Sequence, residues 1–361
     1  MLLGNPHIKR GEYGVPDTYL WPSSIQELTQ NYRSDLDRRR AGCTKQGCPG
    51  IPTGLASLDT VLGGHRGITI IGGSSGVGKS TLALQSVVCG MLADRSLGVI
   101  LCLYECEVFD EVLDRLHCTL AGVRLDKYEA GQFTADEQGR VQQAAKIIEK
   151  NILPRTYVRL RQHDAWTKNW RHWIYEWERS VEKLQRLRSC SRVITVVDRM
   201  QKMPIPIVLE NLNEYEIAEC ARVAADPDTW RLQQIFKACK SKVNENQPYG
   251  LPFLVISEMR KTDTSKRPLG IEDLLGSVSL GYEVDRVLLL QADGNPEGDV
   301  ARTKLKIAKA RRGECSTLDL RFRYREHRFE EFTTPIEIPT IATKIEGKAA
   351  GTSTGNRFRG R

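Results

Sequence analysis

The stretch from Gly73 to Thr81 has the residue types and the spacing of a phosphate-binding loop. Gly73 and Gly78 enclose four residues, and Lys79 and Ser80 follow directly. Glycines let a backbone curl so that its N–H groups point at phosphate oxygens, and a helix that begins there adds partial positive charge. We expect Lys79 to reach the β- and γ-phosphates of a nucleoside triphosphate and the Ser80 hydroxyl to bind Mg²⁺. The residues expected to hold the nucleotide are Gly73, Ser74, Ser75, Gly76, Val77, Gly78, Lys79, Ser80 and Thr81.

The segments beside this loop favour phosphate binding over the alternative, a glycine-rich surface turn. Residues 68–71 form an apolar run that predicts a strand, and residues 81–85 begin a predicted helix that reaches about Ala93. A strand, a glycine-rich loop and a helix in this order place the N–H groups of the loop around a phosphate.

Two acidic residues follow apolar runs that predict buried strands. Glu105 comes after residues 98–104, and Asp198 comes after residues 192–197. Cleavage of a γ-phosphate needs a metal ion and an oriented water. We therefore expect Asp198 to serve Mg²⁺, directly or through a water, and Glu105 to orient and deprotonate the attacking water. Glu107 is the alternative for the second role, and a strand-end aspartate that caps a turn is the alternative for the first.

A pair of basic residues, Lys309 and Arg311, follows a late strand expected over residues 304–308. The transition state of phosphoryl transfer needs positive charge, and a planar guanidinium suits phosphate oxygens. We expect Arg311, with Lys309 beside it, to act as an arginine finger on the γ-phosphate of an adjacent subunit. A solvated charge cluster is the alternative.

Strands alternate with helices along the chain, which predicts an α/β fold with a mostly parallel, twisted sheet flanked by helices. The expected strands are 68–72, 98–104, 192–197, 251–256, 284–291, 304–308, 317–323 and 327–332, and the expected later helices are 108–121, 134–150, 165–187 and 229–243. Ligands of such sheets bind at the carboxyl ends of the strands. Lys79, Glu105, Asp198 and Glu258 all fall just after apolar runs, so we expect them at that edge.

The expected helix 165–187 carries a stripe of apolar residues at spacings of three and four. Its members are Trp166, Trp170, Trp173, Trp177, Val181 and Leu184, and basic residues flank it. Aromatic residues interleaved with basic ones are also typical of surfaces that stack bases. We prefer the interpretation in which the tryptophans face the sheet or a neighbouring subunit and the basic residues face water.

Length and composition are those of a globular protein. The 361 residues are 40% hydrophobic and 27% charged, and the net charge of +8 suits a polyanionic partner without requiring one. The ten cysteines are scattered, which indicates reduced thiols in a cytoplasmic compartment. No apolar run approaches the length of a membrane span, so we expect no membrane partner.

Composition divides the chain into three expected parts. Residues 1–50 are interrupted by prolines and predict an irregular N-terminal arm. Residues 51–335 contain every chemical motif and are expected to form the catalytic domain. Residues 336–361 are expected to form a basic disordered tail, because residues 342–361 are rich in glycine, serine and threonine.

The ordered motifs resemble the RecA-like ATPase domain of the DnaB-type replicative helicases, over about residues 51–332. Asp198-Arg199-Met200-Gln201 is similar to the Asp-Tyr-Leu-Gln of that family, and residues 309–313 are similar to its Lys-x-Arg-x-Gly, whose arginine is the finger. The other segments that carry the resemblance are Ile51-Pro52-Thr53-Gly54 with Leu58-Asp59, residues 99–105, and Lys266-Arg267-Pro268 followed by Glu272-Asp273-Leu274.

This resemblance implies a RecA-like P-loop NTPase that uses ATP and Mg²⁺ at the subunit interfaces of a homohexameric ring. It implies 5′→3′ unwinding on single-stranded DNA at a replication fork, in the cytoplasm of a bacterial or phage-infected cell, with a primase or a loader as partner. By their positions in the matching motifs, Gln201 is expected in the nucleotide site, and Lys261, Lys266 and Arg267 are expected on the DNA backbone.

Two features depart from the family pattern. Ser257-Glu258 stands where the family has a glutamine, and the acidic segment 204–228 is longer than the first DNA loop of the family. A glutamine senses a γ-phosphate by hydrogen bonding, whereas a glutamate repels it unless the glutamate is paired or protonated. These departures favour the alternative, a RecA-superfamily ATPase that binds DNA or protein without unwinding, as a recombinase, a loader or a switch. The Lys309 and Arg311 pair favours the helicase.

Overall fold

The computed structural model describes residues 49–105, 109–164, 169–203, 227–241, 251–260, 269–275 and 283–332, with isolated residues in 29–37, in 213–218 and at 281. The expected tail 336–361 and nearly all of the expected arm 1–50 lie outside the described residues. The same holds for residues 261–268 and for most of the acidic segment 204–228.

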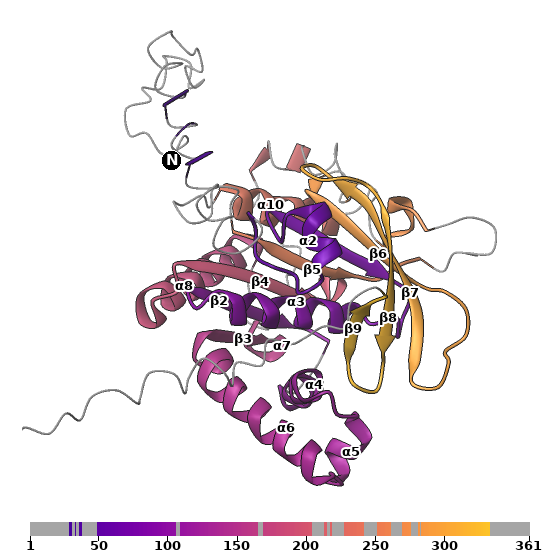
Figure 1. Cartoon of the computed structure of the whole chain (residues 1–361). Helices are drawn as coiled ribbons and strands as arrows, with labels where there is room; N and C mark the ends of the chain where they lie inside the picture. Colours follow the sequence, from indigo (N-terminus) through magenta and orange to yellow (C-terminus); the bar gives the residue numbers. More distant parts are fainter. Residues whose placement is uncertain are drawn as a thin grey trace, which may run out of the picture.

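The described residues form one nine-stranded sheet with the strand order β3-β2-β4-β5-β1-β6-β7-β8-β9 (Figure 1). The strands are β1 (Ile68–Gly73), β2 (Leu97–Leu103), β3 (Thr156–Leu160), β4 (Arg192–Asp198), β5 (Phe253–Ser257), β6 (Arg286–Ala292), β7 (Val300–Ala310), β8 (Thr317–Arg323) and β9 (Arg328–Glu331). Strands from β3 through β6 pair in parallel, and β7, β8 and β9 extend the sheet with antiparallel pairs. The expected α/β fold with a mostly parallel sheet is confirmed.

Helices pack on both faces of the parallel part, which explains why strands such as β2 are buried along their whole length. The helices are α2 (Ala56–Leu62), α3 (Lys79–Ala93), α4 (Asp110–Ala121), α5 (Leu125–Ala130), α6 (Ala135–Ile147), α7 (Arg161–Asp164), α8 (Trp170–Arg188) and α10 (Pro227–Ser241). Figure 1 shows α4, α5 and α6 gathered together, on the other side of the sheet from α10.

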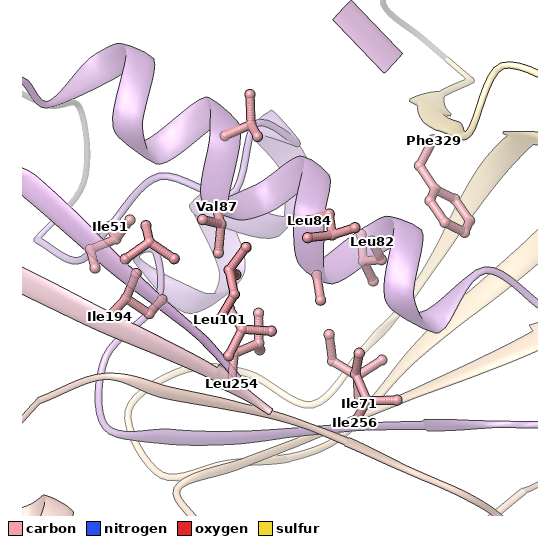
Figure 2. Packing of buried hydrophobic residues seen from close by; sticks show 14 of the residues in the cluster. Ile51, Ile71, Leu82, Leu84, Val87, Leu101, Ile194, Leu254, Ile256 and Phe329 are labelled. Atoms are coloured by element: carbon pink, nitrogen blue, oxygen red, sulfur yellow. The ribbon is translucent and has the colours of Figure 1, made fainter. Parts of the chain in front are cut away.

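Alternate residues along the central strands point to opposite faces and build two separate cores. On one face, Ile71, Leu101 and Ile256 pack with Leu82 and Val87 of α3 (Figure 2). On the other face, residues from the same strands, including Ile70, Ile100 and Val255, pack with α8 and α10. The helix that follows the phosphate loop is therefore held directly against the sheet.

The tryptophan stripe of α8 faces the second core, as expected. Trp173 and Trp177 are completely buried and meet the ring of Phe253 edge-on, with centroids 6.3 and 6.1 Å away. Trp177 Nε1 donates a hydrogen bond of 2.9 Å to the Thr195 hydroxyl on β4. These two buried rings cannot stack on bases, whereas Trp166 lies outside the described residues.

Two described elements, β3 and α5, were not predicted, and β7 is longer than predicted. In β3, Arg159 interrupts the apolar pattern, yet its guanidinium is buried and forms an ion pair of 2.6 Å with Asp164. In β7, buried Leu305 and Ile307 alternate with more exposed Lys304 and Lys306, so one face of the strand meets solvent. Charged residues on a half-buried strand shorten the apolar run that marks it in a sequence.

Two further expectations concern the cysteines and the membrane. All six cysteines within the described residues are free thiols. Among the described helices, none combines the length and the apolar composition needed to cross a membrane.

His65 gives the fold a built-in sensitivity to acid. Its ring is buried, and neither ring nitrogen has a hydrogen-bond partner among the described residues. Burial, with a smaller effect from the charge of Arg286, lowers the pKa of His65 to about 3, below the value near 6.5 of an unfolded histidine. As the pH falls below 6.5, the unfolded state gains a proton that the folded state does not bind, so stability falls.

We expect this group alone to lower the free energy of unfolding by about 2 kcal/mol between pH 7 and pH 5. Urea denaturation of the wild type and of His65→Leu at both pH values measures this contribution, because other titrating groups are common to both proteins. The variant should lose less stability than the wild type over this interval. An equal loss in the two proteins would show that His65 does not cause the acid sensitivity.

Candidate active site

The phosphate loop connects the end of β1 to the start of α3. Because α3 begins at Lys79, its first backbone N–H groups lack partners within the helix and open towards the loop. Lys79 Nζ donates hydrogen bonds to the carbonyl oxygens of Gly73 (2.9 Å) and Ser74 (2.7 Å). The ammonium group is therefore held across the loop that is expected to receive the phosphates.

The glycines of the loop have different physical reasons. Gly78 has a φ of +94°, and a Cβ there would lie 2.7 Å from the ring of Phe329. A Cβ on Gly73 would lie 2.7 Å from the carbonyl oxygen of Leu290 on β6. At Gly76 a Cβ would meet nothing within 4 Å, and the φ of +77° alone favours glycine. The first and last glycines thus let the loop approach the sheet and its C-terminal hairpin.

Asp198 ends β4 beside the loop and offers a place for a metal ion. Its Oδ1 atom is buried and has no hydrogen-bond partner among the described residues, while the Ser80 hydroxyl forms a hydrogen bond with the same carboxyl group. Burial raises the pKa of Asp198, and the hydrogen bond from Ser80 and the charge of Lys79 oppose that rise. Mg²⁺ prefers carboxylate, hydroxyl and phosphate oxygens. An orphaned carboxylate oxygen next to a serine hydroxyl therefore fits Mg²⁺.

Glu105 lies at the same edge, directly after β2. The backbone N–H groups of Tyr104 and Glu105 donate to the carbonyl oxygen of Asp198, at 2.6 and 3.2 Å, so the ends of β2 and β4 are joined. The Glu105 side chain is 47% exposed, which leaves it accessible to water. Burial lowers the pKa of Lys79, and the charges of Asp198 and Glu105 oppose that effect. The expected meeting of Lys79, Asp198 and Glu105 at one edge is thus found.

A buried polar network, which no sequence motif marks, supports the residue before Glu105. The Tyr104 hydroxyl donates to Asp164 Oδ2 at 2.6 Å and accepts from Trp173 Nε1 at 2.9 Å. Asp164 also accepts from Arg159, whose guanidinium lies 5.0 Å from the centroid of the Trp173 ring. The network fixes the end of β2, and it joins residues too far apart in the sequence to form a recognisable pattern.

Gln201 lies near this edge, but its amide group is used within the protein. Its Nε2 atom donates to the Ser257 hydroxyl (3.0 Å) and to the Leu275 carbonyl oxygen (3.1 Å). Its Oε1 atom accepts from the backbone N–H of Glu258 at 3.3 Å. Gln201 therefore joins the end of β4 to the end of β5 and to the segment that returns at residue 275.

The unexpected glutamate at position 258 has a cationic partner. Arg199 forms an ion pair with Glu258, and a second one with Glu105, in which the Arg199 Nη2 to Glu105 Oε1 distance is 3.0 Å. The family pattern marks Glu258 as a departure, but its pairing with Arg199 depends on how β4 and β5 end side by side. The signal was present as a second charged residue, Arg199, at a position where the similar motif has tyrosine.

Lys309 and Arg311 lie at the opposite edge of the sheet from the phosphate loop. β7 runs antiparallel to β6, and Ala310 pairs with Arg286 at the start of β6, whereas Gly73 pairs with Leu290 near its end. Lys309 Nζ donates to the Gly281 carbonyl oxygen at 2.9 Å. Arg311 lies 3.7 Å from Asp285 Oδ1 and is about half exposed. These cations are therefore remote from the phosphate loop of their own chain.

Four residues of the predicted sites fall on parts of the chain outside the described residues. Three of them, Lys261, Lys266 and Arg267, are expected on DNA. The fourth is Glu107, the alternative to Glu105.

Strand order, phosphate loop and strand-end carboxylates together define a RecA-like P-loop ATPase. A family model described as "DnaB-like helicase C terminal domain" matches residues 50–331, which is most of the chain. The protein belongs to this family of replicative helicase domains, whose ATPase function generally involves a nucleotide and Mg²⁺. No curated protein matches the chain.

Solved structures agree with this fold. The ATPase domain of another protein superposes with a TM-score of 0.64 at 19% identity, and the match covers 86% of this chain and 99% of that one. A DnaB-like replicative helicase, solved in a study of its interactions with primase, gives a TM-score of 0.58 at 18% identity. That match covers 78% of this chain and 61% of the other, so this chain spans less than two thirds of that helicase.

Proposed function

We propose that the protein is an ATP-dependent replicative DNA helicase that moves 5′→3′ on single-stranded DNA as a homohexameric ring. The observation that carries the proposal is the division of catalytic groups between the two edges of the sheet. Lys79, Asp198 and Glu105 meet at one edge, and Arg311 lies at the other. A complete set of groups for phosphoryl transfer then requires two copies of the chain.

Each group has a role that its surroundings support. The N–H groups of the loop and Lys79 bind and neutralise the phosphates of ATP. Glu105 orients the attacking water and accepts its proton, for which its exposed carboxylate is suited. Bound Mg²⁺, which Ser80 and Asp198 would hold, supplies neutralisation of the charge on the phosphate oxygens.

Arg311 completes the site in trans. Its distance from the phosphate loop of its own chain argues against a role there, and its guanidinium is about half exposed. In a closed ring with head-to-tail contacts, the edge that carries Arg311 meets the edge that carries Lys79 of the next copy. This arrangement supports nucleotide sites between subunits, with residues 51–335 as the ATPase domain of each.

Single-stranded DNA is the proposed track, and a primase or a loader is the proposed protein partner. Lys261, Lys266 and Arg267 supply positive charge in the segment after β5 and would bind the backbone without reading sequence. The primase proposal follows from the similar DnaB-like helicase, which interacts with primase. The proposed location is the replication fork in the cytoplasm.

Strand displacement on a forked duplex tests the proposed function. With ATP and Mg²⁺, the wild type is expected to release the strand from a fork that carries a 5′ single-stranded tail, and Lys79→Ala is expected to release none, because it lacks the phosphate-binding ammonium. A fork with only a 3′ tail controls for polarity. Hydrolysis of ATP without strand release on either fork would contradict the helicase.

One observation favours a second function. Glu258 replaces a neutral γ-phosphate sensor, and its charge is engaged by Arg199. A site that holds ATP in this way suits a DNA-binding ATPase of the RecA superfamily that changes state without unwinding, such as a recombinase, a loader or a switch. ATP-dependent DNA binding with no strand release in the forked-duplex experiment would identify this alternative.

A further inference from the structure

Arg199 bridges two carboxylates at the edge where the nucleotide is proposed to bind. Its guanidinium contacts Glu105 at the end of β2 and Glu258 at the end of β5, through two different nitrogen atoms. The Arg199 side chain is only 19% exposed, so these charges interact in a partly dehydrated setting. The guanidinium also lies close enough to Lys79 for its charge to lower the pKa of that lysine, after the larger effect of burial.

This arrangement answers the electrostatic problem that Glu258 creates. Two carboxylates, those of Glu105 and Glu258, stand beside a site proposed for a triphosphate, and each would repel it. A single guanidinium neutralises part of this charge and can form paired hydrogen bonds with phosphate oxygens as readily as with carboxylates. The γ-phosphate is therefore a competing partner for Arg199, and a diphosphate lacks that group.

We propose that Arg199 is a triphosphate-dependent positioning residue for Glu105. Without a γ-phosphate, Arg199 clamps Glu105 to Glu258, and the carboxylate of Glu105 cannot orient a water freely. With a triphosphate bound, the guanidinium moves to the γ-phosphate and releases Glu105. Hydrolysis and loss of phosphate restore the clamp. This inference rests on the proposed ATPase function of the same site.

Glu258 connects the clamp to the segment expected to touch DNA. Its carbonyl oxygen accepts from the backbone N–H of Leu275 at 2.8 Å, and the Arg260 N–H donates to the Asp273 carbonyl oxygen at 2.7 Å. These bonds join the two ends of the segment that contains residues 261–268. The partner that Arg199 chooses therefore changes the charge balance at the base of that segment.

Nucleotide affinities test the proposal without depending on turnover. Equilibrium binding of Mg²⁺–ADP and of Mg²⁺–AMP-PNP, a triphosphate analogue that is not hydrolysed, is measured for the full chain without DNA. In Arg199→Met, we expect affinity for AMP-PNP to fall about tenfold and affinity for ADP to change by less than about twofold, because only the triphosphate loses a charged contact. Adding Glu258→Gln to this variant should restore part of the AMP-PNP affinity, because one repelling charge is removed.

Arg124→Met is the matched control. Arg124 also bridges two carboxylates, Asp126 at 2.7 Å and Asp299 at 3.0 Å, but these belong to α5 and to the β6–β7 connection. This control should keep the ratio of the two affinities of the wild type. Should Arg199→Met fail to fold, Arg199→Lys replaces it, because a lysine keeps the charge but lacks the planar fork that bridges two partners.

An unchanged ratio of the two affinities in the Arg199 variant, or an equal weakening of both nucleotides, would overturn the inference and leave the proposed ATPase intact. A wild type that binds neither nucleotide would instead contradict the proposed function and, with it, the role of Arg199.

Discussion

Glu105→Gln is expected to lower the rate of ATP hydrolysis at saturating nucleotide by about a hundredfold or more, the range for loss of a general base. Glutamine has nearly the same size as glutamate but cannot accept a proton from the attacking water. Affinity for Mg²⁺–ADP should change by less than about twofold, because the phosphate-binding atoms of the loop and Lys79 are retained. A coupled assay of ATP hydrolysis, together with equilibrium binding of Mg²⁺–ADP, measures both quantities.

Glu176→Gln is the control for the loss of one carboxylate. Glu176 lies on α8, is exposed, and forms only a long ion pair of 3.4 Å with Arg179. This variant should keep the turnover of the wild type. If Glu105→Gln also keeps full turnover, the general base is another group, and Glu107→Gln becomes the variant to measure.

The parts of the site that lie next to one another in the chain could be predicted from the sequence. The loop from Gly73 to Ser80 is local, and its flanking strand and helix have strong apolar patterns. Asp198 and Glu105 were predictable because continuous apolar runs mark buried parallel strands, and the carboxyl ends of such strands meet at one edge. The order of the strands in the sheet was not needed for this step.

Contacts between side chains from different strands could not be predicted in the same way. The ion pair between Arg199 and Glu258 requires β4 and β5 to be neighbours, which the structure shows and a single sequence does not. Arg159 was a poor strand signal because a charged residue on a buried strand is unfavourable unless a partner is present. Its partner, Asp164, lies in α7, beyond the end of β3.

Arg311→Ala is expected to lower ATP turnover by about a thousandfold or more, the lower end of the range for arginine fingers, although Arg311 is remote from the phosphate loop of its own chain. The variant should still bind ATP, because Lys79 and the loop are unchanged. Turnover in the presence of single-stranded DNA measures the effect. Arg179→Ala on α8, a similarly exposed arginine, is the control and should keep the turnover of the wild type.

Mixing two inactive variants separates a role in trans from a role within one chain. Arg311→Ala retains Lys79, and Lys79→Ala retains Arg311. In a mixed ring, some interfaces join an intact loop to an intact finger, and the turnover expected at a 1:1 ratio is on the order of a quarter of the wild type if the sites act independently. Lys79→Ala mixed with the double variant Lys79→Ala/Arg311→Ala should recover none, because no interface then has an intact loop.

The opposite placement of the two groups makes this recovery a strict requirement. Asp285 lies beside Arg311 and also accepts the backbone N–H of Ile68 at 2.9 Å, so the finger is attached to the start of β1, while Lys79 follows its end. No rotation of the Arg311 side chain spans the length of that strand, since six residues of a strand extend about 20 Å. If no ratio of the two variants restores hydrolysis although mixed rings form, Arg311 does not act across an interface, and the ring mechanism loses its main support.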